Sequence, residues 1–167
     1  GQDVSCVMRG AHLDAVNSGG LTRRVAGAEF KARVKASDDP STLGPQDVVI
    51  CTLKATGLPS FAASLQPLLG DDTAVVFAQN GVPWWYDIGL SSSHPAVPDL
   101  AFLDPDGRLR AAIPRERIVG GVVFSSNEII APGIAANLSP ERNRLLVGEC
   151  DDRASERVAK LRAALNE

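Results

Sequence analysis

Apolar and polar positions follow two different periods along the chain, and these periods predict strands and helices. Residues 47–53 and 73–78 are nearly continuous apolar runs, as expected for strands covered on both sheet faces. Residues 58–69 place apolar side chains on one stripe and carry Pro59 near their start, which favours a helix. Strand, helix and strand joined by tight turns predict a βαβ unit with parallel strands and a right-handed crossover.

Weaker patterns before and after this unit predict further elements. We expect strands at residues 3–8, 118–125 and 144–148, helices at 11–18 and 154–165, a hairpin with one wet face within 21–36, and a turn at Pro132 and Gly133 after residues 128–131. These elements together predict an α/β fold. Its centre is a Rossmann-like dinucleotide-binding sheet, mostly parallel, with extra strands in the second half.

Composition narrows the class of protein. The chain has 167 residues, 44% of them hydrophobic, and a net charge of −3, which fits one globular domain. No run of one charge predicts a nucleic-acid or anionic-membrane partner, and no apolar stretch predicts a membrane span or an export leader. We expect reduced thiols at Cys6, Cys51 and Cys150 and a cytoplasmic protein. His12 and His94 lack ligand-like spacing, so we predict no metal site.

The ends of three predicted strands carry polar side chains: Arg9, Lys54 and the pair Gln79 and Asn80. Ligands of open parallel sheets bind outside the carboxyl ends of the strands. Two cations and two amides at one edge would suit an anionic ligand such as a phosphorylated nucleotide. Each of these side chains taken singly also fits an ordinary solvated strand end, and the sequence leaves both readings open.

Arg9 carries the most specific hypothesis at that edge. The second strand of a dinucleotide fold ends where the adenosine ribose is read, and an arginine there favours the 2′-phosphate of NADP. The glycine turn that holds the pyrophosphate is not found, because Gly10, Gly19, Gly20 and Gly27 do not have GxGxxG spacing. The pattern predicts a dinucleotide-binding domain whose opening strand, turn and helix are absent.

The stretch VVFAQNGVPWWY, residues 75–86, joins a buried strand to an aromatic segment. Gly81 is expected to allow positive φ or close backbone approach where the chain leaves the sheet. Two readings of Trp84, Trp85 and Tyr86 stay open. The rings pack against the loops and the later strands, or they line the entrance to a binding site.

Several of these stretches together resemble the 2-dehydropantoate 2-reductase (ketopantoate reductase) family. The matching pieces are DVSCVMRGAHLDAVNSGGL, DVVICTLKA, VVFAQNGVPWWY, DPDGRL, IVGGVVFSSNEIIAPGIAANL and RLLVGE, in the family's order. The resemblance implies an enzyme that reduces ketopantoate with NADPH to pantoate, in the biosynthesis of pantothenate and coenzyme A. It implies a small 2-keto acid as partner, and it leaves a homodimer open.

The resemblance also assigns site residues. Arg9 would bind the 2′-phosphate of NADPH, Lys54 would lie near the nicotinamide, and Asn80 would hydrogen-bond both cofactor and substrate. The backbone near Ser126 and Asn127 would touch the nicotinamide end. A lysine of a C-terminal helical domain would donate the proton, and residues 1–167, a partial NADP-binding domain, contain no counterpart of it. Lys160 lies within the last predicted helix and is not assigned that role.

Two alternatives remain beside this reading. The chain could be a catalytically inactive fragment or binding module of the family that associates with a partner chain. It could also be part of a related reductase that acts on another 2-keto acid, since most of the substrate pocket is expected outside these residues.

Overall fold

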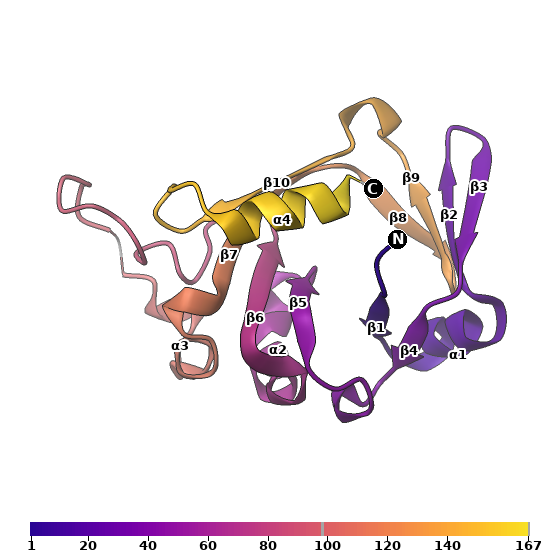
Figure 1. The fold of residues 1–167 in the computed structure, drawn as a ribbon, viewed down its shortest axis with the longest axis horizontal. Coiled ribbons are helices and arrows are strands. Elements are labelled where there is room, and N and C mark those ends of the chain that lie inside the picture. Colours follow the sequence, from indigo (N-terminus) through magenta and orange to yellow (C-terminus); the bar gives the residue numbers. More distant parts are fainter. Residues whose placement is uncertain (98, 167) are drawn as a thin grey trace. The chain divides into compact units, whose positions relative to one another are not determined.

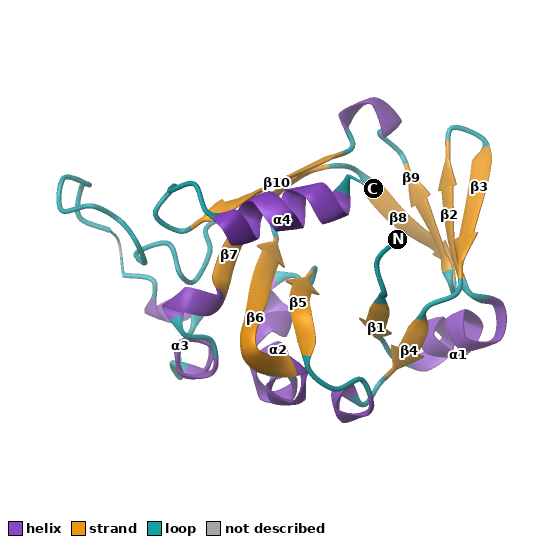
Figure 2. Ribbon diagram, in the orientation of Figure 1, coloured by secondary structure: helices purple, strands orange, loops and turns teal. Residues whose placement is uncertain are grey.

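The computed structural model describes residues 1–97 and 99–166, and these residues form two compact units. The first unit combines Gly1–Gly44 with Phe124–Leu145, and the second combines Pro45–Val123 with the residues from Leu146 onward. The chain therefore passes between the units after Gly44, Val123 and Leu145. Figure 1 traces this path by colour, and Figure 2 shows helices and strands in both units.

The first unit opens with a short parallel pair of strands. β1 (Ser5–Val7) pairs with β4 (Lys35–Ser37), with Ser5 opposite Lys35. α1 (Gly10–Gly19) follows β1, and Gly20 ends it at φ 83°, a conformation that favours glycine. A Cβ on Gly20 would also meet the carbonyl oxygen of Ala32 at 2.7 Å. The predicted strand and helix are both confirmed here.

A second sheet of the first unit has the strand order β3-β2-β9-β8. The predicted hairpin is confirmed as the antiparallel pair β2 and β3, whereas β9 runs parallel to β2 and antiparallel to β8. The expected single wet face is wrong for β3, because every residue of this strand is exposed. The strands are β2 (Leu21–Val25), β3 (Ala28–Ala32), β8 (Asn127–Ala131) and β9 (Ile134–Asn137).

The sheet of the second unit has the strand order β10-β7-β6-β5. β6 runs parallel to both β5 and β7, which confirms the parallel pairing of the predicted βαβ unit. Five consecutive residues of β6, from Thr73 to Phe77, are buried, so this strand forms the centre of the core. The strands are β5 (Gln46–Cys51), β6 (Leu69–Ala78), β7 (Ile118–Phe124) and β10 (Arg144–Glu149).

Helices lie on both faces of this sheet (Figure 1). α2 (Leu58–Ser64) lies behind β5 and β6, where the Phe61 ring meets the Phe77 ring edge-on at 6.2 Å. α4 (Glu156–Leu165) passes in front, and Arg162 of this helix donates to the carbonyl of Val147 at 2.6 Å. Ser155 caps α4 by accepting from the backbone N–H of Val158. α3 (Arg108–Ala112) is a short third helix of the unit.

Three expectations about this unit are wrong in detail. β5 is covered on one face only, because Val48 and Ile50 are 36% and 41% exposed on a strand that forms the sheet edge. α2 is shorter than predicted because Pro67 has no N–H, and residues Gln66–Leu68 form a 3₁₀ turn. β6 starts at Leu69 and includes the glycine and aspartates that were expected to separate helix from strand.

The fold class is α/β as predicted, but the strands within the described residues form three sheets rather than one mostly parallel sheet. The extra strands of the second half divide between the units. β8 and β9 join the hairpin, and β10 joins the parallel strands. Hydrophobic alternation predicts that a segment is a strand, but the partner of that strand depends on contacts between distant residues. Among the residues that the structure describes, no helix is long and apolar enough to cross a membrane.

Candidate functional site

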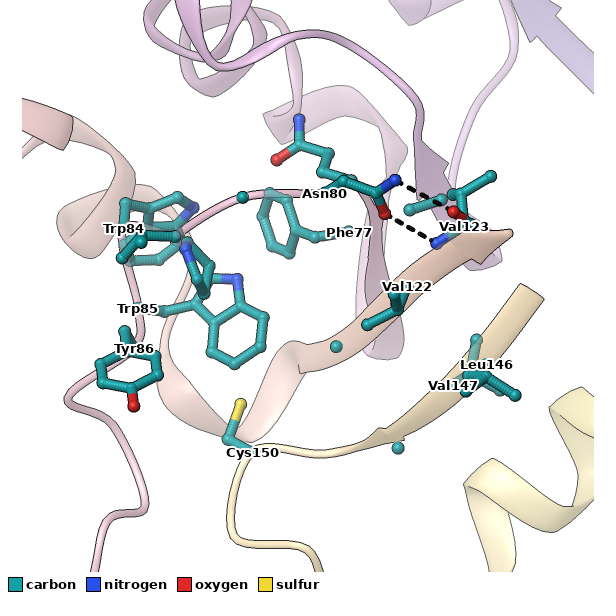
Figure 3. Close-up of a pocket in the computed structure, with 18 of the residues that line it drawn as sticks. Phe77, Asn80, Trp84, Trp85, Tyr86, Val122, Val123, Leu146, Val147 and Cys150 are labelled. Carbon is teal, nitrogen blue, oxygen red and sulfur yellow. Dashed lines mark hydrogen bonds between the residues drawn. The ribbon is translucent and has the colours of Figure 1, made fainter. Parts of the chain in front are cut away.

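A cavity of about 910 Å³ opens at the carboxyl ends of β5, β6 and β7, and its lining comes entirely from the second unit (Figure 3). Part of the lining is polar and contains the strand-end residues, and another part, the aromatic wall, contains Trp84, Trp85 and Tyr86. Because β6 is buried along its second half, the floor of this cavity is a well-packed part of the core. Its lining includes Lys54, Gln79, Asn80, Trp84, Trp85, Tyr86, Gly120, Val123 and Cys150.

Asn80 is the second residue after β6, and both polar atoms of its amide bond to the end of β7 (Figure 3). Its Nδ2 donates to the carbonyl of Val123 at 3.0 Å, and its Oδ1 accepts from the Val123 N–H at 2.9 Å. Each side-chain atom still has one free hydrogen-bonding position, because an amide offers two N–H groups and two lone pairs. Asn80 therefore has a structural role in the sheet and retains capacity for a ligand.

Gln79 and Lys54 lie on the β5 side of the same edge. The Gln79 Nε2 donates to the carbonyl of Leu53, the residue immediately before Lys54. Lys54 is exposed and lines the cavity, and its own carbonyl accepts from the Gly57 N–H at 2.8 Å, which starts the turn into α2. Lys54, the cation predicted at this strand end, therefore lies on a backbone segment that hydrogen bonds fix at the Leu53 and Lys54 carbonyls.

Gly81 turns the chain out of the sheet after Asn80. Its φ is 97°, a value that strains residues with a side chain, so the predicted positive φ is confirmed. This turn leads directly to Trp84 and Trp85.

Trp84 forms the buried part of the aromatic wall. It is 2% exposed, and its ring meets Phe77 edge-on at 5.7 Å. The guanidinium of Arg110 lies 5.7 Å from the Trp84 ring centre, donates to the Trp84 carbonyl at 2.7 Å and pairs with Asp87 at 2.6 Å. Hydrogen bonding to Arg110 holds the pKa of the Asp87 carboxyl below its ordinary value. The packing reading is correct for Trp84, which also lines the cavity.

Trp85 and Tyr86 form the more open part of the aromatic wall. Trp85 lies directly on Gly120 of β7, where an added Cβ would come within 2.8 Å of its ring. Tyr86 is 45% exposed. The indole N–H groups of Trp84 and Trp85 are buried without a hydrogen-bond partner among the described residues. This wall is therefore an apolar surface beside the polar strand ends.

The three cysteines are free, as predicted, and none has the character of a nucleophile. Burial raises the pKa of the Cys150 thiol to about 11 and raises the pKa of Cys51 and Cys6 as well. A thiol that stays protonated at neutral pH is a weak nucleophile. Cys150 thus contributes a neutral, apolar surface to the cavity. No group of metal-ligating side chains occurs within residues 1–97 and 99–166.

The structure brings together only part of the predicted site. Lys54 and Asn80 line the same cavity, whereas Arg9 and Asn127 belong to the first unit. Arg9 stands at the start of α1 and makes no capping bond with its side chain. The Asn127 amide bonds to Ser125 Oγ at 2.8 Å and accepts from Asn137 Nδ2 at 2.9 Å, within a polar cluster.

Sequence reasoning missed two parts of the cavity. The contact between Trp85 and Gly120 joins positions 35 residues apart, and the paired glycines of β7 were the only signal for it. The bonds from Gln79 to Leu53 and from Asn80 to Val123 depend on which strands are neighbours. Adjacent amides at a strand end were visible in the sequence, but their partners were not.

Comparison with known proteins agrees with this geometry. Residues 1–88 match the family described as Ketopantoate reductase PanE/ApbA. A 2-dehydropantoate 2-reductase of Mesorhizobium japonicum is 40% identical over 159 residues, which cover 95% of this chain and 48% of that protein.

Solved structures give the same result. A proposed ketopantoate reductase from Ralstonia solanacearum MolK2 is similar with a TM-score of 0.83 and 38% identity, over 95% of this chain and 48% of that one. A 2-dehydropantoate 2-reductase from Geobacter metallireducens GS-15 has a TM-score of 0.73 and 26% identity, over 98% and 46%. The chain thus spans about half the length of these relatives, and it belongs to the ketopantoate reductase PanE/ApbA family.

Proposed function

We propose that these residues form the cofactor side of an enzyme that reduces the ketone of ketopantoate with NADPH. The observation that carries this proposal is the cavity at the carboxyl ends of β5, β6 and β7, which has a cation and two amides on its rim. This is the edge where open parallel sheets bind nucleotides. The 40% identity to a 2-dehydropantoate 2-reductase supports ketopantoate as the substrate.

The residues of the cavity suit the nicotinamide end of a dinucleotide. Lys54 supplies a positive charge, Gly81 lets the backbone turn close to a ligand, and the apolar wall offers a surface for a flat ring. A reduced nicotinamide, when bound, supplies the hydride. Asn80 would orient the ligand through its remaining N–H and lone pair, and the wall from Trp84 to Tyr86 would exclude water.

The first unit offers a separate place for a phosphate group. Arg9 stands at the N-terminus of α1, and the first turn of this helix contains no acidic residue. A helix N-terminus favours negative charge, and an arginine adds a strong phosphate contact. We propose that Arg9 selects NADPH over NADH through the 2′-phosphate.

The test uses the full-length protein and compares the cofactors and several 2-keto acids. We expect ketopantoate to be reduced with NADPH. A charge-assisted phosphate contact of about 1.5–3 kcal/mol predicts that Arg9→Ala raises the KM for NADPH by roughly tenfold to a hundredfold and changes the KM for NADH little. Arg33→Ala, at an exposed position of the same unit, is the control. Equal changes for both cofactors would remove Arg9 from the phosphate site.

The same assay tests the alternatives. Faster reduction of another 2-keto acid would identify a related reductase. If none of the 2-keto acids causes the full-length protein to oxidise NADPH, the interpretation as an inactive binding module replaces that of an enzyme.

A further inference from the structure

Gln79 and Asn80 are consecutive residues, and their amide groups reach opposite neighbours of β6. Gln79 donates to the carbonyl of Leu53, beyond the end of β5. Asn80 makes two bonds to the backbone of Val123 in β7. Because β6 lies between β5 and β7 in the sheet, two adjacent side chains join the carboxyl ends of three parallel strands.

These bonds begin where the backbone ladders stop. The last backbone pair between β5 and β6 is Cys51 with Phe77, and the last pair between β6 and β7 is Ala78 with Gly121. A primary amide carries the same donor and acceptor groups as a peptide bond. The two side chains therefore replace the missing backbone partners and extend the sheet at the edge that borders the cavity.

The bond from Gln79 also has a consequence for Lys54. Its acceptor is the carbonyl of Leu53, so it fixes the peptide that leads directly into the cavity-lining lysine. On the other side, the Lys54 carbonyl is held by the Gly57 N–H. Without Gln79, the strand end before Lys54 would lose its hydrogen bond to the residue that follows β6, and the position of the ammonium group would become less defined.

We propose that Gln79 is a positioning residue: its amide holds the Leu53 carbonyl and thereby sets Lys54 at the rim of the cavity. This inference rests on the proposed function, because it assigns Gln79 to the reaction through Lys54. Gln79 itself needs no contact with cofactor or substrate. A contribution to stability alone would leave the turnover of the folded enzyme unchanged, so kinetics separate the two roles.

The test compares Gln79→Ala and Gln79→Glu in the full-length protein. Gln66→Glu is the matched control, at an exposed position on the 3₁₀ turn after α2. Because small misplacements in a site can cost large factors in rate, we expect Gln79→Ala to lower kcat about tenfold or more at saturating cofactor and keto acid. The control should keep the wild-type kcat.

Gln79→Glu adds a signature in the pH profile. An ionised carboxylate repels the Leu53 carbonyl, whereas a protonated carboxyl regains a donor. We therefore expect the ratio of variant to wild-type kcat to rise as the pH falls. The same ratio for Gln79→Ala should stay flat. Wild-type kcat in both variants, whatever their melting temperatures, would overturn the proposal.

A second readout remains decisive if the full-length protein reduces no 2-keto acid. That result would count against the proposed enzyme, and hydrogen exchange would then test the contact itself. Loss of the Gln79 bond should speed exchange of the Gly57 amide at least severalfold relative to the Gln66→Glu control. Equal exchange rates would show that Gln79 does not hold this strand end and would overturn the proposal.

Discussion

In the second unit, Val75, Val76 and Phe77 of β6 are no more than 1% exposed, whereas every residue of β3 in the first unit is exposed. The two sheets therefore depend on different interactions. The parallel sheet is stabilised by apolar burial between helices on both faces. The sheet of the first unit depends more on backbone pairing and on a cluster of polar side chains around Asn137, which is 8% exposed.

This difference bears on where a site can form. A cavity whose floor is a close-packed strand has side chains held in fixed positions, as binding and catalysis require. The Trp84 ring illustrates this, because Phe77 and Arg110 contact it from two sides. A sheet exposed along β3 and most of β8 gives less support of this kind. The contrast explains why the described cavity, with one strand-end cation and two amides, belongs to the second unit.

The largest expected effect comes from truncating the buried aromatic core. Phe77→Ala should reduce the free energy of unfolding by about 3–5 kcal/mol, because the ring is buried against Phe61 and Trp84. Phe30→Ala, at a 52% exposed position of β3, should cost less than about 1 kcal/mol. Urea unfolding followed by circular dichroism, which reports on the secondary structure of both units, measures both losses.

If Phe77→Ala does not fold, Phe77→Leu should show a smaller loss in the same direction. Equal losses for the Phe77 and Phe30 variants would contradict the contrast between the two sheets.

A smaller effect on stability is expected when the polar cluster of the first unit is disrupted. The Asn137 Nδ2 reaches Ser125, Asn127 and Asn143 within 3.2 Å, and its Oδ1 accepts from the Ser139 N–H. Asn137→Ala removes all of these bonds, including those to the Asn127 Oδ1 and from the Ser139 N–H, and should cost about 1–3 kcal/mol. Hydrogen exchange of β8 and β9 should become faster, with little change in β6.

Asn17→Ala, at an exposed position of α1, is the control for this variant and should be neutral or slightly stabilising. If Asn137→Ala speeds hydrogen exchange more in β6 than in β9, the cluster stabilises the sheet of the second unit, which would contradict this account.

The smallest expected effect is a pH dependence at the ion pair between β10 and α4. Glu149 pairs with Arg157 at 2.5 Å and accepts from Ser155, and these hydrogen bonds hold the Glu149 pKa below its ordinary value of 4.5. A carboxyl with a lowered pKa contributes stability above its unfolded value, and this contribution is lost as the pH falls through the folded pKa. Because Arg157 is 37% exposed, solvent screening limits the contribution to below about 1 kcal/mol.

Unfolding as a function of pH measures this contribution. Glu149→Gln should flatten the loss of stability below pH about 4.5 relative to the wild type. Glu156→Gln, whose carboxyl is 82% exposed, should leave it unchanged. If the free energy of unfolding falls equally with pH in the wild type and in Glu149→Gln, the loss of stability comes from other carboxyl groups.

The contrast between the sheets also shows how far the sequence could predict the structure. Long apolar runs predicted both β6 and its parallel partner β5, although only β6 is buried on both faces. The exposure of Val48 and Ile50 could not be predicted, because it depends on β5 lying at an edge. The partners of β8 and β9 were equally hidden, since short strands have no pattern that specifies a neighbour.

The candidate site was predictable to the same degree. The rule that ligands bind at the carboxyl ends of strands identified Lys54 and Asn80, and both line the cavity. Their joint location required only that β5 and β6 be neighbours, which the βαβ pattern indicates. The role of Gln79 depends on a bond across 26 positions, and the contact of Trp85 with Gly120 needs the three-dimensional path of the loop.

The most direct test of the central claim is a crystal structure of the full-length protein with NADPH and a 2-keto acid. The account predicts the nicotinamide at the carboxyl ends of β5 and β6, between Lys54 and Asn80, and facing the wall from Trp84 to Tyr86. Nicotinamide density outside this cavity, with Lys54 and Asn80 distant from the cofactor, would contradict it.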